Sequence, residues 1–235
     1  MAEPRGIVTI DGPAGAGKST VAKMLAAALG YLYLDSGALY RLVGWQAAEQ
    51  QVNLDDAPAL SAFLEGLHPE VIAAGQDFTL VLNGREVTRV LREPRVSQEA
   101  SRVAVLTPVR AWVTAKLRQL AAHGGVVAEG RDLGTVVYPQ AEVKFYLDAA
   151  LETRAARRRQ EWQHEGRPLS PEKVAREVAE RDRRDASRAT APMRAAADAL
   201  IIDTTDLNPQ EVVRLCLDRI MEVWPGTAGL ATKIG

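Results

Sequence analysis

The chain has 235 residues, a length that suits one domain with at most an insertion, and its 29 Lys and Arg against 30 Asp and Glu give a net charge of −1. That balance excludes the broad basic surface typical of nucleic-acid or anionic-membrane binding, so any anion site must be local. Cys216 is the single cysteine, which excludes an internal disulfide and a cysteine-based zinc site and fits a reducing compartment. Because no long apolar run and no charged-then-apolar leader is present, we expect a cytoplasmic protein without a membrane span or secretion signal.

The first predicted elements are a strand over 7–11 and a helix after residue 20, joined by the glycine-rich stretch "GPAGAGKST". Its spacing is that of a P-loop, in which glycines let consecutive N–H groups turn inward around phosphate oxygens at the positive end of a helix. The lysine adds a point charge, and the serine hydroxyl stands where a Mg²⁺ ion on the β- and γ-phosphates needs a ligand. The predicted phosphate-binding residues are Gly12, Pro13, Ala14, Gly15, Ala16, Gly17, Lys18, Ser19 and Thr20.

Apolar strand-like runs recur along the chain, each followed by a segment of helical period. This alternation predicts an α/β fold with a five-stranded parallel sheet covered by helices on both faces. Three of the runs end in an acidic residue, Asp11, Asp35 or Glu129, where the carboxyl edge of the sheet would form a ligand crevice. The predicted strands cover 7–11, 31–35, 126–130, 143–148 and 200–205.

Three segments depart from this rhythm. Residues 71–92 alternate with period two around Asn83-Gly84, a tight-hairpin signal, so we predict a small antiparallel sheet inserted at about 63–93. The arginine-rich stretch at about 157–168 is predicted to be a mobile lid, because a phosphate-binding enzyme needs cations that close over its substrate. Residues 225–235 read as a flexible tail.

Arginines stand in polar clusters after several core elements, which indicates a second anionic substrate recognised by planar guanidinium groups. The guanine-reading pattern Asn-Lys-x-Asp of GTP switches is absent from the chain. Asp35 could serve as the base of an alcohol kinase of shikimate-kinase type, but a small hydroxy acid does not need so many arginines or an inserted sheet. We therefore favour a phosphate acceptor. The arginines are Arg41, Arg110, Arg131, Arg181, Arg184 and Arg188.

The blocks "VTIDGPAGAGKST", "YLDSGALYR", "VAEGRDLGTVVYP", "VKFYLDA" and "ERDRRDASRATAP" resemble those of bacterial cytidylate kinases, a family of P-loop nucleoside monophosphate kinases. The resemblance covers nearly the whole chain and implies a single P-loop kinase domain over 1–235, of three layers, with the inserted sheet in its monophosphate-binding region and a helical lid. Glu129 stands where some members carry Asp, which keeps the charge but lengthens the side chain; the resemblance implies that Ser19 binds Mg²⁺ directly and Glu129 through water.

Site roles follow from this resemblance. It implies that Arg41 and Arg131 bind the acceptor phosphate, that Arg181 and Asp185 hold the ribose, and that arginines of the lid, Arg154, Arg157 and Arg158, close over the donor. The implied catalytic residues are Lys18, Arg131 and Arg158. Cytosine offers an amino group at N4 to a carboxylate such as Asp132, whereas uracil would present an oxygen there. The residues implied around the pyrimidine are Ser36, Ser101, Arg110, Asp132 and Arg188.

We therefore expect Mg²⁺-dependent transfer of the γ-phosphoryl group of ATP to CMP or dCMP. Two alternatives stay open: a kinase of wider UMP and CMP specificity, and a kinase of a small hydroxylated metabolite. Small-molecule nucleotides are the expected partners, without nucleic acid or membrane, and a monomer is the expectation from the resemblance.

Overall fold

The computed structural model describes residues 6–74, 77–164, 169–188 and 190–226. Five strands form a parallel sheet in the order β2-β6-β1-β7-β8. The predicted parallel sheet is thus confirmed, with three of its strands slightly shorter than expected. The strands are β1 Ile7–Asp11, β2 Leu32–Asp35, β6 Val126–Glu129, β7 Val143–Asp148 and β8 Leu200–Asp203.

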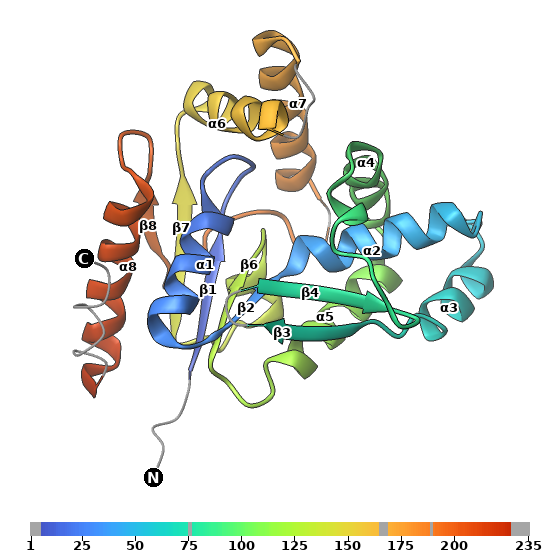
Figure 1. Cartoon of the computed structure of the whole chain (residues 1–235), viewed down its shortest axis with the longest axis horizontal. Helices are drawn as coiled ribbons and strands as arrows, with labels where there is room; N and C mark the ends of the chain where they lie inside the picture. Colours follow the sequence, from blue (N-terminus) through green and yellow to red (C-terminus); the bar gives the residue numbers. More distant parts are fainter. Residues whose placement is uncertain (1–5, 75–76, 165–168, 189, 227–235) are drawn as a thin grey trace.

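Helices cover both faces of this sheet (Figure 1). In β1 the consecutive residues Val8, Thr9 and Ile10 are all fully buried, which requires cover on both sides because successive side chains point to opposite faces. Helices α1 and α8 pack on each other, and α2 packs on α4 and α5. Among the described residues, no helix combines the length and apolar character needed to cross a membrane. The helices are α1 Lys18–Leu29, α2 Ser36–Glu49, α3 Ala57–Glu65, α4 Pro94–Val103, α5 Thr107–Leu120, α6 Leu151–His164, α7 Pro171–Ala186 and α8 Pro209–Val223.

The helix boundaries follow local sequence signals. Asn208 accepts a hydrogen bond from the backbone N–H of Glu211, whose side chain accepts one from the Asn208 N–H, so a capping box begins α8. Ser170 caps α7 in front of Pro171. Gly30 ends α1 at a φ of 64°, a conformation that glycine adopts without strain.

The predicted antiparallel insertion is present as three strands, β3 Glu70–Ala74, β4 Asp77–Leu82 and β5 Arg85–Glu86. Asn83 and Gly84 join β4 to β5 with φ values of 52° and 73°, which confirms the tight hairpin turn. Phe78 of β4 is buried and meets Tyr33 of β2 edge-on, with ring centroids 6.4 Å apart. This small sheet therefore shares the main hydrophobic core.

Helices α6 and α7 form a hairpin at the end of the sheet where β1 enters the glycine-rich loop (Figure 1). Residues 157–164 of the predicted lid belong to α6, whereas 165–168 lie outside the described residues, as do 227–235 of the predicted tail. A separate apolar cluster holds the hairpin together: Trp162 of α6 packs with Val174 and Val178 of α7. Ala14 of the glycine-rich loop joins this cluster, so the loop contacts the hairpin directly.

Candidate functional site

The glycine-rich loop Gly12–Gly17 links β1 to α1 and needs its glycines for two physical reasons. Gly12, Gly15 and Gly17 have φ values of 143°, 78° and 86°, which side-chain-bearing residues rarely adopt. A Cβ atom would lie 2.0 Å from the Leu147 carbonyl oxygen at Gly12 and 2.5 Å from the Arg154 carbonyl oxygen at Gly15. The loop therefore lies directly against the end of β7 and the start of α6.

Lys18, the first residue of α1, is 6% exposed, and its Nζ donates a hydrogen bond to the Pro13 carbonyl oxygen at 2.6 Å. Burial and the nearby Arg131 cation lower the pKa of Lys18 to about 7, while Glu129 opposes the shift. An ammonium group in such surroundings gains strongly from an anion placed beside it. The Lys18 charge thus lies against the glycine-rich loop, and its role in binding phosphate stays a prediction.

Ser19 and Glu129, the two residues predicted near Mg²⁺, come together at the mouth of the loop. Burial, with Asp35 adding, raises the pKa of Glu129, whereas Lys18 and hydrogen bonds with Ser19 and Tyr33 lower it. The Tyr33 hydroxyl donates to Glu129 Oε1 at 2.6 Å and fixes the carboxylate. One hydroxyl and one carboxylate oxygen fit a Mg²⁺ ion, which keeps most of its ligands as water and substrate phosphate.

Arg181 of α7 lies among other cations, and Arg131 and Arg181 both act on the Lys18 ammonium group. Burial and repulsion by Arg131 lower the pKa of Arg181 to about 9, with Arg158 and Arg41 adding to the repulsion and Asp185 opposing it. Within the described part of the chain, the Arg181 side chain makes no hydrogen bond or ion pair. Cations that repel one another are stabilised when a multiply charged anion binds between them.

Asp185 of α7 connects two of the predicted acceptor residues. Its carboxylate is 4% exposed, with Oδ2 accepting from Arg131 Nε at 2.9 Å and Oδ1 paired with Arg188. Burial alone would raise the pKa of Asp185, but the Arg131 and Arg188 cations outweigh it and hold the pKa below its usual value. The carboxylate stays ionised and orients both guanidinium groups.

Asp132, the residue predicted to read the base, forms a buried ion pair with Arg110 of α5. Burial raises the pKa of Asp132, while the cations of Arg110 and Arg188 lower it. Arg110 also donates to the Ala104 carbonyl oxygen at 3.2 Å and stands 5.8 Å from the ring centroid of Tyr40. Tyr40 was not predicted, although it directly precedes Arg41 in the sequence.

The remaining predicted acceptor residues lie on α2 and α4. The Ser36 hydroxyl donates to the Glu129 carbonyl oxygen at 2.7 Å, which joins the start of α2 to the end of β6. Arg41 pairs with Asp35 at 2.6 Å. Ser101 donates to the Ser97 carbonyl oxygen on its own helix at 3.2 Å, and its place beside the base stays a prediction.

The three arginines of α6 have different partners, a distinction that their shared segment did not predict. Arg154 donates to the Ala14 carbonyl oxygen at 3.1 Å and pairs with Asp182 of α7, whose Oδ1 accepts from the Ala14 N–H at 3.1 Å. The hairpin thus holds both backbone groups of Ala14 in the loop. Arg158 instead pairs with Glu161 at 2.7 Å and lies 5.0 Å from the Trp162 ring centroid.

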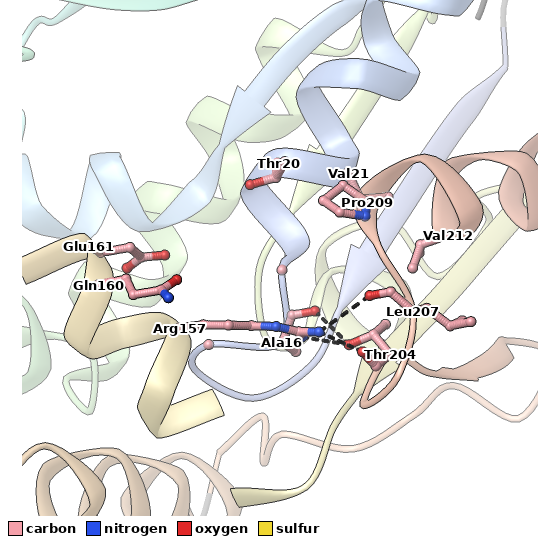
Figure 2. A pocket seen from close by; sticks show the side chains of 12 residues that line it. Ala16, Thr20, Val21, Arg157, Gln160, Glu161, Thr204, Leu207, Pro209 and Val212 are labelled. Atoms are coloured by element: carbon pink, nitrogen blue, oxygen red, sulfur yellow. Dashed lines mark hydrogen bonds between the residues drawn. The ribbon is translucent and has the colours of Figure 1, made fainter. Parts of the chain in front are cut away.

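A cavity of about 300 Å³ opens beside the loop, bounded by α6 and by the segment between β8 and α8 (Figure 2). Figure 2 shows Arg157 reaching across it to Thr204, with Nη1 donating to Oγ1 at 2.9 Å and Nη2 to the carbonyl oxygen at 2.6 Å. Val21, Pro209 and Val212 supply apolar lining. Sequence analysis missed this cavity, because its walls come from distant segments.

Comparison with known proteins gives a consistent result. The family model described as Cytidylate kinase matches residues 8–222. A protein named Cytidylate kinase from Geobacillus sp. is 46% identical over 216 residues, covering 92% of this chain and 95% of its own. A protein of the same name from Carboxydothermus hydrogenoformans is 45% identical over 213 residues, covering 91% of this chain and 96% of its own. One from Shewanella loihica is 42% identical over 226 residues, covering 96% and 98%.

Proposed function

The chain belongs to the cytidylate kinase family, and on this premise we propose that it transfers the γ-phosphoryl group of ATP to CMP or dCMP, giving ADP and CDP or dCDP. The observation that carries the proposal is the closeness of Lys18, beside the P-loop, to Arg131 and Arg181, whose cations lower the pKa of Lys18. A donor phosphate chain and an acceptor phosphate are the two anions that such an arrangement suits.

On the donor side, the ATP phosphates are held by the Lys18 ammonium and by those backbone N–H groups of Gly12–Thr20 that remain free to donate, since Pro13 has none and the Ala14 N–H donates to Asp182. The cavity beside Arg157 receives the adenine base, since it combines apolar walls with a planar guanidinium that can stack on an aromatic ring. Ser19 would hold Mg²⁺ directly, and Glu129 would hold it through a water molecule. When bound, the ion neutralises charge on the β- and γ-phosphates.

On the acceptor side, Arg41 and Arg131 bind the CMP phosphate, while Arg181 and Asp185 hold the ribose hydroxyls. Asp132 accepts a hydrogen bond from the cytosine amino group, and the charged partners of Asp132 complete the base site. Uracil would instead turn its O4 carbonyl toward the carboxylate, an unfavourable contact. The residues assigned to the pyrimidine are Ser36, Ser101, Arg110, Asp132 and Arg188.

The acceptor needs no general base, because a CMP phosphate oxygen is already an anion at neutral pH. The chain therefore contributes alignment and charge: Lys18 and Arg131 neutralise the transferring group, and Arg158 joins them when the α6–α7 hairpin closes and excludes water. The Glu161 pairing of Arg158 is exposed enough to exchange for phosphate at little cost.

The test of the proposed function is Asp132→Ala, assayed with CMP and UMP. Loss of a charge-assisted hydrogen bond costs about 1.5–3 kcal/mol, so kcat/KM for CMP should fall by about ten- to a hundredfold. The kcat/KM for UMP should fall much less, because the same substitution removes the repulsion between the Asp132 carboxylate and the uracil O4 oxygen. A ratio of the two kcat/KM values that stays as in wild type would overturn the base-reading role of Asp132.

A substrate panel separates the alternatives. Wild-type enzyme should phosphorylate CMP and dCMP in preference to UMP, AMP and shikimate. Equal turnover of UMP would favour the broader pyrimidine kinase, and turnover of shikimate alone would favour an alcohol kinase with Asp35 as base.

The role of residues 157–168 as a lid belongs to the same proposal. Its support is the separate apolar cluster of the hairpin, which lets α6 and α7 move as one unit on their contact with Ala14. Amide hydrogen exchange in this range should be faster than in β6 and should slow when both nucleotides are bound. Exchange as slow as in β6, and unchanged by nucleotides, would count against closure.

A further inference from the structure

The segment that follows Asp132 is a π-helical turn, η2 Leu133–Val137. Its defining bonds span five residues, from the Val137 N–H to the Asp132 carbonyl oxygen at 3.3 Å and from the Tyr138 N–H to the Leu133 carbonyl oxygen at 2.7 Å. Such turns are rare and often occur at functional sites. The position of the Asp132 backbone therefore depends on how this turn is held.

Asp11, the last residue of β1, holds the beginning of the turn. Its Oδ1 accepts from the Leu133 N–H at 2.9 Å and its Oδ2 from the Gly134 N–H at 2.7 Å. The carboxylate is 4% exposed, so both bonds are shielded from water. The first N–H groups of a helical turn lack partners within it, and here a neighbouring strand supplies both acceptors.

The rest of the π-helical turn also packs closely against neighbouring elements. A Cβ atom on Gly134 would lie 3.1 Å from Thr9 Oγ1, 3.2 Å from Lys144 Cδ and 3.4 Å from Asp11 Oδ2. At the far end, Arg118 of α5 donates to the Val137 carbonyl oxygen at 2.9 Å. The turn is thus clamped at both ends, and Asp11 forms the clamp next to Asp132.

We propose that Asp11 is a positioning residue for acceptor selectivity: by holding the Leu133 and Gly134 amides it fixes Asp132 where the carboxylate meets the cytosine amino group. The inference rests on the proposed function of Asp132. Asp11 acts through the turn and does not touch the nucleotide. Asp11 directly precedes Gly12, but its carboxylate bonds to the turn after Asp132, so we expect its substitution to affect the acceptor side and not the donor loop.

The first test is Asp11→Asn, which keeps the shape of the side chain. An amide has one acceptor oxygen and one NH₂ group, so one backbone N–H would face a second donor and lose its bond. We expect kcat/KM for CMP to fall about tenfold and that for UMP by less than about threefold, which narrows the preference. The Kd of a non-hydrolysable ATP analogue should change by less than about twofold.

Asp56→Asn is the matched control, since Asp56 accepts from the Ala59 N–H at 3.1 Å at the exposed start of α3. This variant should keep the wild-type kcat/KM for CMP and for UMP and the wild-type Kd of the ATP analogue. Asp11→Asn could lower kcat/KM for CMP and UMP by the same factor, or raise the Kd of the ATP analogue by as large a factor as it lowers kcat/KM for CMP. Either result would show that Asp11 has a structural role only, and the inference would be overturned.

Gly134→Ala provides a second variant that changes no charge and applies should Asp11→Asn fail to fold. Its extra methyl group would lie 3.1 Å from Thr9 Oγ1 and 3.2 Å from Lys144 Cδ, so the turn has to shift relative to the strand that carries Asp11. This shift should narrow the preference for CMP over UMP in the same way, and an unchanged preference would overturn the inference. Asp132→Ala separates the two proposals. If it leaves the CMP to UMP ratio unchanged, the base-reading role fails. If it narrows the ratio while Asp11→Asn and Gly134→Ala do not, only the role of Asp11 fails.

Discussion

The proposed donor loop and the proposed acceptor pocket are built in different ways. The loop is one continuous segment whose binding groups are backbone N–H, set by three glycines with positive φ. The acceptor pocket takes side chains from separate elements, and its acids and arginines pair with each other: Asp185 with Arg131 and Arg188, and Asp132 with Arg110. The loop therefore depends on backbone conformation, whereas the pocket depends on a network in which the loss of one member releases others.

The largest expected effect comes from Lys18, the charged side chain at the donor loop. Lys18→Ala should leave the fold intact and lower kcat by about a thousandfold or more, because a charge aimed at the transferring group matters most in the transition state. Circular dichroism and steady-state kinetics test this prediction. Near-normal turnover in a folded variant would rule out the phosphate role of the loop.

Asp185→Asn should break the acceptor network and leave the donor loop unaffected. Removing one partner of a buried pair leaves uncompensated charge, here on Arg131 and Arg188, so we expect kcat/KM for CMP to fall about a hundredfold. The Kd of an ATP analogue, measured by calorimetry, should stay within about twofold. Glu222→Gln is the control, since Glu222 forms an exposed ion pair with Arg219 within α8. Equal losses in both variants would contradict a specific network.

Gly15→Ala and Gly17→Ala form a matched pair that tests the backbone character of the loop. Both positions have similar positive φ, which costs an alanine about 1–2 kcal/mol of folding stability. A Cβ at Gly17 meets no atom within 4 Å, whereas one at Gly15 would lie 2.5 Å from the Arg154 carbonyl oxygen. Gly15→Ala should therefore cost about 1–3 kcal/mol more in urea unfolding. Equal costs would show that the contact with α6 is dispensable.

The smallest effect concerns Asp11, where the two regions meet. Burial raises the pKa of Asp11 to about 6, with Asp132 adding and the Leu133 and Gly134 N–H groups opposing. The folded protein then binds a proton more readily than the unfolded chain, so Asp11 adds stability as the pH falls through 6. Relative to Asp11→Asn, the free energy of unfolding of the wild type should increase by on the order of 1 kcal/mol when the pH is lowered from 7 to 5. A constant difference in the free energy of unfolding would contradict this pKa.

Sequence reasoning identified most of the candidate residues but few of their partners. It predicted Asp132, Asp185 and Arg131 as acceptor residues, yet not that Asp185 orients Arg131. It also grouped the arginines of α6 into one lid, whereas Arg154 binds Ala14 and Arg157 binds Thr204. These pairings join residues far apart in the chain, and no local pattern encodes which distant side chain an arginine will meet.

By itself, the sequence determined the features that depend on neighbouring residues: the glycine-rich loop between a strand and a helix, the apolar strands of a parallel sheet, and the Asn83-Gly84 hairpin. Steric limits on φ and the periodicity of side chains act over a few residues, so they can be read locally. Only the tertiary structure decided the placement of β1 between β6 and β7. That order brings the loop after β1 beside the turn after β6, so Asp11 can hold the backbone next to Asp132, and the residues proposed for donor and acceptor lie at the same edge of the sheet.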